Sequence, residues 1–436
     1  MDRSPPSDGT ALPRLITPLP GPRSRAWIDR LAAVECPAIT ARRARRARAL
    51  QVDQDDPIVW ARAWGANVED VDGNVLVDLT AGFGAAGAGH AAPTVVAALQ
   101  QQSERLLHAM GDAFPDPRRI ELMERLCALT GMERVILGSS GSDAVEAALK
   151  TAALASGRPG VLVFDRSYHG LSYGALAASD YKAADFRGPF AGQLAEHVRV
   201  SAFGGPLPSP AELREAGVGA LLVEPIQGRG GVRTPPPGWL PRLRALADQA
   251  GAVLIYDEIQ TGFWRTGPAL AFQDEGARPD LLCLGKGMGG GFPISACLGS
   301  EAVMQAWGHS KGEAIHTQTF LGNPLGCAMA LAAIDRLEEL APRVPVLGDW
   351  LEEQARARGL GLRGRGLMRG LTLPSGPDAL ALSRGLMSRG YIALPAGEVR
   401  PGEDPREAVV LCLTPPLCVS EEQLAGFLAA LDEVRA

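Results

Sequence analysis

Short apolar runs alternate with helical segments between residues 134 and 300. The runs lie at residues 134–138, 160–165, 220–226, 252–258, 281–286 and 294–300. Helical patterns stand between several of them, most clearly at residues 142–155, with Ser142 as the expected N-cap, and at residues 239–251. Strands that are apolar along their whole length are typical of a mostly parallel sheet covered by helices on both faces. The alternation therefore predicts an α/β fold around such a sheet.

The segments that flank this region have other patterns. Residues 1 to about 25 are rich in proline, glycine and polar residues, and they predict a loose arm. Residues 66–79 hold two strand-like runs around an Asp-Gly turn and predict a hairpin. Residues 81–90 are so rich in glycine that they predict a loop whose backbone closely approaches another group. After about residue 325, a long helix and a mixture of helices and short strands indicate a smaller α+β domain.

Polar side chains follow the first two predicted strands. In open parallel sheets, ligands bind beyond the carboxyl ends of the strands. Ser140, Gly141 and Ser142 follow the first run and open a helix, where free N–H groups and hydroxyls favour a phosphate. This loop is not a Walker motif, because no Gly-Lys-Ser/Thr follows. Tyr168 follows the second run and offers an aromatic face for stacking.

Two later strand ends carry charged groups. The run at residues 252–258 ends in Asp257 and Glu258, and buried carboxylates are rare unless they are paired, so one of them could meet a cationic ring nitrogen. The run at residues 281–286 ends in Lys286, one of only four lysines among 43 basic residues. Arginine cannot replace lysine as a nucleophile, and an apolar site lowers the pKa of an amine from its usual value of about 10.4. Lys286 is therefore the strongest candidate for a reactive amine.

These groups together match one cofactor. A phosphate cup, a stacking ring, an acid and an amine correspond to the phosphate, the ring face, the pyridinium nitrogen and the aldehyde of pyridoxal phosphate (PLP). A dinucleotide enzyme is a less favoured alternative. No G-x-G-x-x-G follows the first run with an acid about 20 residues further on, as that site requires.

Composition excludes several other classes of protein. The net charge of −6 provides no basic field that would attract nucleic acid. The seven cysteines form no C-x-x-C pair, which indicates reduced thiols in the cytoplasm and neither a disulfide framework nor a metal site. No uninterrupted apolar stretch of about 18 residues predicts a membrane span, and the N-terminus lacks the apolar centre of a signal peptide. We therefore expect a cytoplasmic protein that binds neither nucleic acid nor membranes.

The chain resembles the class III (omega-type) aminotransferases of PLP fold type I over residues 55 to 430. The resemblance rests on the motifs SSGSDAVEAALK, VEPIQGRGGV, YDEIQTGFWRTG, PDLLCLGKGMGGGFPISA and HTQTFLGNPLGCAMA, which occur in the order and spacing of the family. It implies a large domain with a mostly parallel seven-stranded sheet and a smaller α+β domain built from the N- and C-terminal segments. The implied limits are residues 1–80 for the arm and part of the small domain, 81–330 for the large domain, and 331–436 for the C-terminal small domain.

The resemblance also implies roles for the residues that contact the cofactor ring. In the family, the lysine that matches Lys286 holds PLP covalently and then moves a proton between the substrate and the cofactor. The residue that matches Asp257 pairs with the pyridine nitrogen. Gln260 occupies the place of a residue that touches the ring oxygen, and Tyr168 the place of one that stacks on the ring. The match to Glu224 supports this site from outside the ring contacts, although it could equally be a structural acid at a strand end.

Further roles concern the phosphate and the quaternary structure. The loop that matches Gly141 and Ser142 binds the phosphate in relatives. The residue that matches Thr319 reaches the phosphate of the neighbouring subunit's cofactor. The resemblance therefore implies a homodimer with active sites at the interface, and it leaves open whether two dimers form a tetramer.

Three positions depart from the family pattern, and all three concern substrate carboxylates. Relatives that act on 4-aminobutyrate or ornithine have a glutamate at Arg229, an arginine at Cys412, and often a further arginine at Leu171. We hypothesise that Arg229 provides a relocated carboxylate site, and that Leu171 and Phe83 make the pocket more apolar. The alternative is that Arg229 faces solvent or pairs with an acid, and that a nearby arginine such as Arg400 binds the carboxylate.

The reaction implied by the resemblance is a ping-pong transfer of an amino group from an amine or amino acid to an α-keto acid. The departures favour a donor with a hydrophobic or aminated side chain over 4-aminobutyrate or ornithine. Racemases, epimerases and aminomutases use the same lysine and the same cofactor, so the motifs leave them open. A non-catalytic PLP-binding protein is a second alternative. The presence of the lysine, the acid and the stacking residue argues against it.

Overall fold

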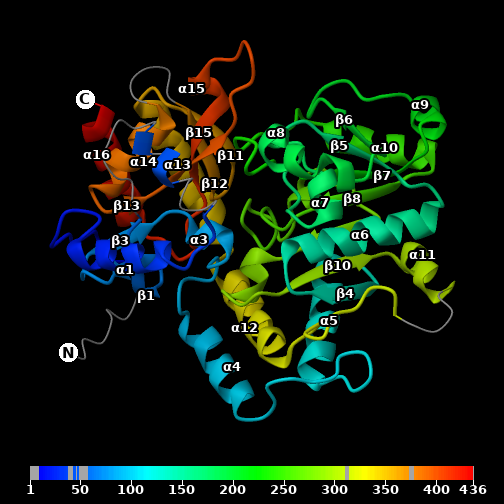
Figure 1. Cartoon of the computed structure of the whole chain (residues 1–436), viewed down its shortest axis with the longest axis horizontal. Helices are drawn as coiled ribbons and strands as arrows, with labels where there is room; N and C mark the ends of the chain where they lie inside the picture. Colours follow the sequence, from blue (N-terminus) through cyan, green and yellow to red (C-terminus); the bar gives the residue numbers. More distant parts are fainter. Residues whose placement is uncertain are drawn as a thin grey trace.

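The largest sheet has seven strands in the order β4-β10-β9-β8-β7-β5-β6 (Figure 1). The computed structural model describes residues 9–37, 43–45, 47–48, 57–309, 314–372 and 378–435. Strand β10 runs antiparallel to both of its neighbours, and the other pairs are parallel. The predicted mostly parallel sheet is therefore confirmed. The strands are β4 Arg134–Gly138, β5 Gly160–Phe164, β6 Val198–Ser201, β7 Val218–Val223, β8 Val253–Asp257, β9 Leu281–Leu284 and β10 Ser295–Gly299.

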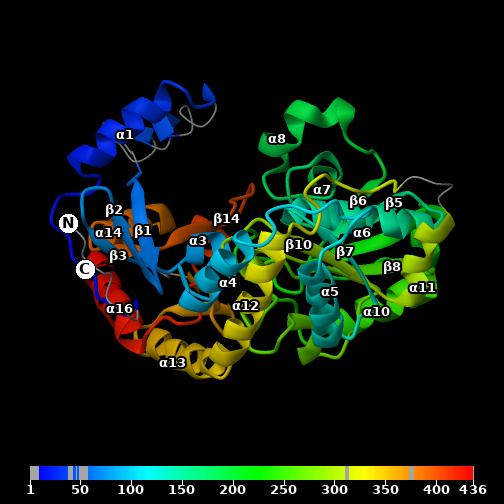
Figure 2. The same cartoon turned by 90° about the horizontal axis from the view of Figure 1, so that it is seen from below.

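Helices cover both faces of this sheet, as the apolar runs predict. Successive residues of one strand point to opposite faces, and Leu221 and Leu222 of β7 accordingly belong to two different apolar clusters. Helices α6 (Gly141–Ser156) and α7 (Tyr173–Ala177) cover one face, while the other face packs against α5, α9 and α10 (Figure 2). These last three helices are α5 Pro117–Thr130, α9 Pro210–Glu215 and α10 Trp239–Ala250.

Two four-stranded sheets form the smaller part of the molecule. The first has the order β1-β2-β3-β13, with β1 Trp60–Trp64, β2 Asn67–Asp70, β3 Val75–Asp78 and β13 Tyr391–Ile392. Strands β2 and β3 are antiparallel, which confirms the predicted hairpin. The second has the order β11-β12-β15-β14, with β11 Gly361–Arg365, β12 Met368–Thr372, β14 Leu394–Gly397 and β15 Val409–Leu413. Because β13 pairs with β3, segments from both halves of the chain build this part.

The N-terminal arm is bound to the hairpin from residue 9 onward, so the prediction of a loose arm is wrong there. The side chain of Asn67 accepts a hydrogen bond from the backbone N–H of Ala11 at 3.0 Å, and Asn74 accepts one from Ile16 at 2.7 Å. Both asparagines are buried. A buried amide is costly without partners, and the arm supplies them. Residues 1–8 lie outside the described part of the chain.

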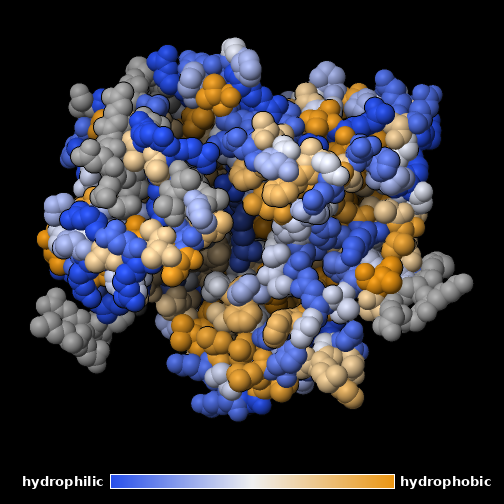
Figure 3. Space-filling model, viewed as in Figure 1, coloured by the Kyte–Doolittle hydropathy of each residue, from blue (hydrophilic) through white to orange (hydrophobic). Residues whose placement is uncertain are grey.

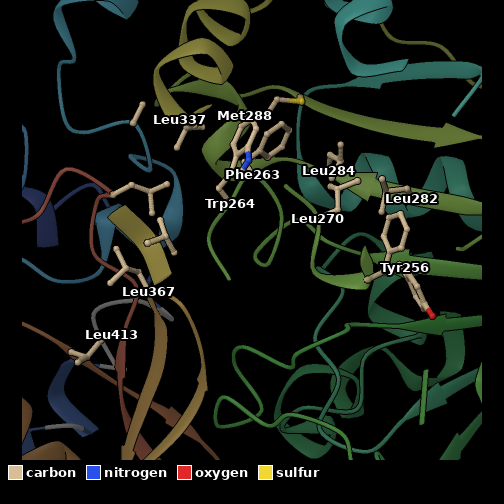
Figure 4. Packing of buried hydrophobic residues seen from close by; sticks show 14 of the residues in the cluster. Tyr256, Phe263, Trp264, Leu270, Leu282, Leu284, Met288, Leu337, Leu367 and Leu413 are labelled. Carbon is tan, nitrogen blue, oxygen red and sulfur yellow. The ribbon is translucent and has the colours of Figure 1, made fainter. Parts of the chain in front are cut away.

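One apolar core connects the large sheet with the smaller part. Figure 4 shows Met288 beside Leu337, with Leu367 and Leu413 of the smaller part beyond them, and all four belong to one cluster of buried residues.

The further helices are α1 Pro22–Ala32, α3 Ala81–Gly84, α4 Pro93–Ser103, α8 Ala183–Phe186, α11 Glu301–Met304, α12 Pro324–Leu340, α13 Arg343–Ala357, α14 Ala379–Met387, α15 Pro405–Ala408 and α16 Glu421–Arg435, with 3-10 turns η1 Gly188–Gln193, η2 Ala271–Asp274, η3 Lys286–Gly289 and η4 Gln305–His309. None of the described helices combines the length and the apolar character that a bilayer span requires. The domain limits at residues 80 and 330 stay predictions.

Candidate active site

A cavity of about 210 Å³ lies at the carboxyl ends of the parallel strands and collects most of the predicted site residues. Its walls include the predicted residues Ser140, Gly141, Ser142, Tyr168, Glu224, Asp257, Gln260 and Lys286. His169, Gly170 and Ile259 also line it, and the sequence reasoning assigned them no role. Residues up to 146 positions apart in the sequence thus meet where the topology of an open sheet places a ligand.

The N-terminus of α6 forms one end of the cavity. The predicted N-cap, Ser142, is wrong, because the cap is Ser140, whose side chain accepts a hydrogen bond from the backbone N–H of Asp143. Asp143 in turn accepts from the backbone N–H of Ser140, so the two residues form a capping box. The first N–H groups of a helix have no acceptor within it and carry the positive end of its dipole. This end of the cavity therefore suits a phosphate.

A glycine lets the loop after β5 reach the same helix end. Gly170 has a φ of +125°, and a Cβ atom there would lie 2.0 Å from Oγ of Ser142. Any other residue would collide with the serine or strain the backbone. The serine hydroxyl accepts a hydrogen bond from the N–H of Leu171 at 3.2 Å, which fixes this loop against the helix.

Another part of the cavity wall carries a buried carboxylate held by a histidine. Oδ2 of Asp257, at the end of β8, lies 2.8 Å from Nδ1 of His169, and its Oδ1 accepts from the N–H of Ile259 at 3.1 Å. The neighbouring acid, Glu258, points away and accepts hydrogen bonds from Thr261 and from the N–H groups of residues 271 and 272. Of the two acids that end this strand, Asp257 is therefore the one that faces the cavity.

His169 is the main residue that the sequence reasoning missed. It is 2% exposed, and its Nε2 has no hydrogen-bond partner among the described residues. Because a carboxylate only accepts hydrogen bonds, Nδ1 of the imidazole carries the hydrogen that points at Asp257. The histidine thus fixes the orientation of this carboxylate.

Lys286 begins η3 in a strained conformation. Its φ is +46°, which costs a residue with a side chain about 1–2 kcal/mol, and such strain concentrates at functional sites. Nζ lies 3.3 Å from Oε1 of Gln260, and a Cβ atom on Gly84 would lie 3.4 Å from Cδ of the lysine. The glycine-rich loop predicted at residues 81–90 thus runs along the lysine side chain. Burial lowers the pKa of Lys286, and Arg229 acts in the same direction, whereas Asp257 opposes it.

Glu224 lines the cavity and holds two of its loops together. Its carboxylate accepts hydrogen bonds from the backbone N–H groups of Tyr168 at 3.0 Å and Gly228 at 3.1 Å, which joins the loops after β5 and β7. Burial raises the pKa of Glu224 to about 7, although the nearby His169 opposes this. A proton is therefore available on this carboxyl group near neutral pH.

The raised pKa of Glu224 has a consequence for stability. The folded protein retains a proton that the unfolded chain releases between pH 4.5 and about 7, so the free energy of unfolding falls as pH rises through this window. We expect Glu224→Gln to flatten this fall by up to about 1.4 kcal/mol per pH unit. Urea unfolding of the apoprotein at pH 5, 6 and 7 measures how steeply the free energy of unfolding changes with pH. The exposed Glu124→Gln is the control and should retain the wild-type slope; equal slopes in all three proteins would contradict the prediction.

The remaining predicted residues do not line the cavity. Phe83, Leu171 and Thr319 are exposed, Phe83 at 72% and Leu171 at 48%. Cys412, on β15, packs against a separate apolar cluster, and burial raises the pKa of its thiol to about 11. Arg229 lies at the edge of the cavity, where its guanidinium carbon is 4.5 Å from the ring centroid of Tyr168.

The cavity fits PLP on chemical grounds. A helix N-terminus suits its phosphate, an aromatic ring is available for stacking, a carboxylate oriented by a histidine suits its ring nitrogen, and a lysine with a lowered pKa suits its aldehyde. The lysine and the carboxylate come from adjacent strand ends of one rigid sheet. The site and the fold together define a PLP-dependent enzyme of fold type I.

Comparison with known proteins identifies the family. The family model described as Aminotransferase class-III matches residues 50–434. The chain is 34% identical to the acetylornithine aminotransferase of Methanosarcina acetivorans over 390 residues, which cover 86% of this chain and 91% of that protein. It is 35% identical to the putrescine aminotransferase of Pectobacterium atrosepticum over 394 residues, or 86% of this chain and 81% of that protein.

Solved structures agree with this result. The ornithine aminotransferase of Toxoplasma gondii superposes with a TM-score of 0.78 at 30% identity, covering 94% of this chain and 97% of that one. A PLP-bound amine transaminase from an uncultivated Pseudomonas species superposes with a TM-score of 0.76 at 30% identity, covering 87% of this chain and 95% of that one. The chain belongs to the class III aminotransferases. It is a PLP-dependent transferase whose substrates are an amine or amino acid and a keto acid.

Proposed function

We propose that Lys286 and Asp257 carry the chemistry of a ping-pong transamination in this chain. The observation that supports this most directly is the buried lysine amine with a lowered pKa, in one cavity with a carboxylate that a histidine orients. When bound, PLP withdraws electrons from the substrate carbon, provided that its ring nitrogen is protonated. Asp257 would keep the proton on that nitrogen, and His169 would keep the carboxylate in place. Nζ of Lys286, whose pKa is lowered by burial, would accept the proton from the substrate carbon.

Other side chains would hold the cofactor in the orientation that this chemistry requires. The N–H groups of Gly141 and Ser142, next to the Ser140 cap, would bind the phosphate. Tyr168 would stack on the ring, and Gln260, within 3.3 Å of the lysine amine, would contact the ring oxygen. Glu224 would act as a positioning residue, since it holds the backbone of Tyr168.

We further propose that Arg229 binds the substrate carboxylate. Its guanidinium lies over two aromatic rings, 4.5 Å from the centroid of Tyr168 and 5.4 Å from that of Tyr181. Its side chain makes no hydrogen bond or ion pair with the part of the chain that the structure describes. A half-buried, stacked arginine without an acid partner retains a planar set of donors for an incoming carboxylate.

The competing candidate, Arg400, is already engaged. Its Nη2 lies 2.6 Å from Oδ2 of Asp180, and its Nε lies 2.7 Å from Oε1 of Glu398. An arginine held by two carboxylates would have to leave at least one of them to bind a third. These contacts favour Arg229 over Arg400 as the substrate anchor.

Substitution of Arg229 should affect the two half-reactions unequally. We expect Arg229→Ala to raise the KM for the keto acid by about tenfold to a hundredfold, because a hydrogen bond to a charged group contributes about 1.5–3 kcal/mol. The KM for a donor amine without a carboxylate should change little. Arg229→Lys keeps the charge but loses the planar donors, so its KM for the keto acid should lie between those of the wild type and Arg229→Ala. Steady-state kinetics with both substrates varied measures this, and equal effects on both KM values would refute the assignment.

The donor that we propose carries its amine on an apolar or aminated chain. The relatives named above act, by their names, on acetylornithine, putrescine or ornithine, all of which have an aliphatic chain. In this chain Cys412 and Leu171 add no charge near the cavity, and Phe83 and Leu171 offer apolar surface. The seven cysteines, all free in the structure, support a reducing compartment such as the cytoplasm.

We propose a homodimer on the basis of an exposed apolar surface. The segment between α4 and α5, the start of α5 and the loop before α12 expose Leu106, Leu107, Met110, Phe114, Ile120 and Phe320. The segment between α4 and α5 touches the loop before α12, since the rings of His108 and Phe320 are 5.3 Å apart. Figure 3 shows apolar residues gathered over α4 and α12 on this face. Thr319 lies on this surface next to Phe320, where it would reach the cofactor of the second subunit. Sedimentation equilibrium tests the dimer, which a purely monomeric protein would exclude.

A further inference from the structure

A cavity larger than the candidate active site lies elsewhere in the described chain. It has a volume of about 750 Å³, within the range of small-molecule sites. Its walls come from the residues after β5 and β6, the loop after β7, strand β11, and α15 with the segment that leads into it. It shares no lining residue with the active-site cavity. Nothing in the transamination described above makes use of it.

Three arginines line this cavity: Arg166, Arg233 and Arg363. Arg233 is engaged, because its Nη1 donates to Oδ2 of Asp165 at 3.1 Å and to Oε1 of Gln227 at 3.0 Å. Arg166 is only partly engaged. Its Nη2 pairs with Glu403, but its Nε makes no hydrogen bond with any described residue and lies 3.9 Å from Oδ2 of Asp165, although the side chain is more than nine-tenths buried. Such an unmet buried donor is costly in a folded protein.

The side chain of Arg363, on β11, has no partner in the described structure. It is half-buried, and its guanidinium makes neither a hydrogen bond nor an ion pair with any described residue. Burial lowers the pKa of Arg363, and Arg233 and Arg166 act in the same direction, while Glu407 opposes them. The three guanidinium groups therefore share one electrostatic environment, in which a further negative charge would be favourable.

The acids on the wall do not supply that charge. Glu403 is held by Arg166 and by the backbone N–H of Arg400, which its Oε2 accepts at 2.9 Å. Asp404 caps α15 and pairs with Arg406. Glu407 is exposed to water and has no direct contact with Arg363. None of these acids is therefore hydrogen-bonded to the guanidinium of Arg363.

We propose that this cavity is a second ligand site, which binds a small metabolite through a phosphate or carboxylate group. The guanidinium of Arg363 and Nε of Arg166 donate to the oxyanion. Phe203 and Leu362, which also line the cavity, offer apolar surface to the rest of the molecule. The site is independent of the proposed function, because it takes neither the cofactor nor the transamination substrates.

Isothermal titration of the PLP-loaded enzyme tests the proposal, with inorganic phosphate and succinate as separate probes. We expect one of the two to bind with about one site per chain, and the probe that binds identifies the oxyanion. Arg363→Met should weaken this binding by at least about tenfold, whereas Arg356→Met, an exposed arginine on α13, should leave it unchanged. Because Arg363 has no partner to lose, the variant should fold; Arg363→Lys, which keeps the charge but not the planar donors, is a second variant and should also weaken binding.

Succinate needs one more control, because the proposed carboxylate anchor of the active site, Arg229, could also bind it. The titration is therefore repeated in Arg229→Ala, where binding to the second site should persist. Binding that is lost in Arg229→Ala and retained in Arg363→Met would assign it to the active site and overturn the proposal. Failure of both probes to bind would overturn it as well. Neither result would bear on the catalytic roles of Lys286 and Asp257.

Discussion

Lys286→Ala is expected to lose at least about a thousandfold in turnover, because a general base alone contributes about 10²–10⁴ and the covalent attachment of the cofactor is lost as well. The fold should persist. The strained φ of +46° at this residue is imposed by the backbone, and alanine leaves it in place. Steady-state assays with an excess of amine and keto acid measure the loss, and unfolding curves verify the fold.

Two further variants make this result specific. Lys286→Arg retains a positive charge of similar reach but cannot act as a nucleophile or lose its proton, so it should be as inactive as alanine. Lys150→Arg is the matched control at an exposed lysine of α6, outside the cavity, and should retain activity. Wild-type turnover in Lys286→Ala would be incompatible with the proposed mechanism.

Asp257→Asn should lose about two to three powers of ten in turnover, the usual loss when one preorganised electrostatic partner is removed. An amide has nearly the shape of the carboxylate and can still meet Nδ1 of His169, but it cannot stabilise a proton on the cofactor ring. Binding of PLP should weaken far less than turnover. Rates and cofactor affinity are measured on the same preparation.

The adjacent acid on the same strand offers a matched control for Asp257. Glu258 is also buried, yet its oxygens accept hydrogen bonds from Thr261 and from backbone N–H groups of residues 271 and 272. Glu258→Gln should therefore reduce stability more than turnover. Near-wild-type activity of Asp257→Asn, or equal losses in both variants, would count against the role of Asp257.

The sequence predicted the fully buried strands at the centre of the large sheet and missed two strands with several exposed residues. All six residues of β7 are buried, so its apolar run is continuous and easy to recognise. Strand β6, Val198–Ser201, lies at the edge of the sheet, and two of its four residues are exposed. Strand β1, Trp60–Trp64, likewise exposes its first three residues. Exposed edge strands have no long apolar run that would predict them. They form because they pair with a neighbouring strand of the sheet.

In the site, the residue types were readable but their orientations were not. Neighbouring residues of a strand point to opposite faces, so the strand pattern alone could not decide which of Asp257 and Glu258 faces the cavity, and only the resemblance favoured Asp257. The contact of His169 with Asp257 joins residues 88 positions apart and depends on the strand order. The N-cap was different, because a serine three residues before Asp143 is a capping-box signal that favours Ser140. That signal was available in the sequence.

A single half-reaction tests the central claim most directly. The purified PLP-loaded enzyme is mixed with one amine at a time, without keto acid, while the visible absorbance of the cofactor is followed and the carbonyl product is quantified. We predict a stoichiometric loss of the visible absorbance, with one carbonyl released per site, and the series of amines then ranks the donors. Persistent visible absorbance, with exchange of the substrate's α-hydrogen into deuterated water and no carbonyl product, would contradict transamination and indicate a racemase or epimerase.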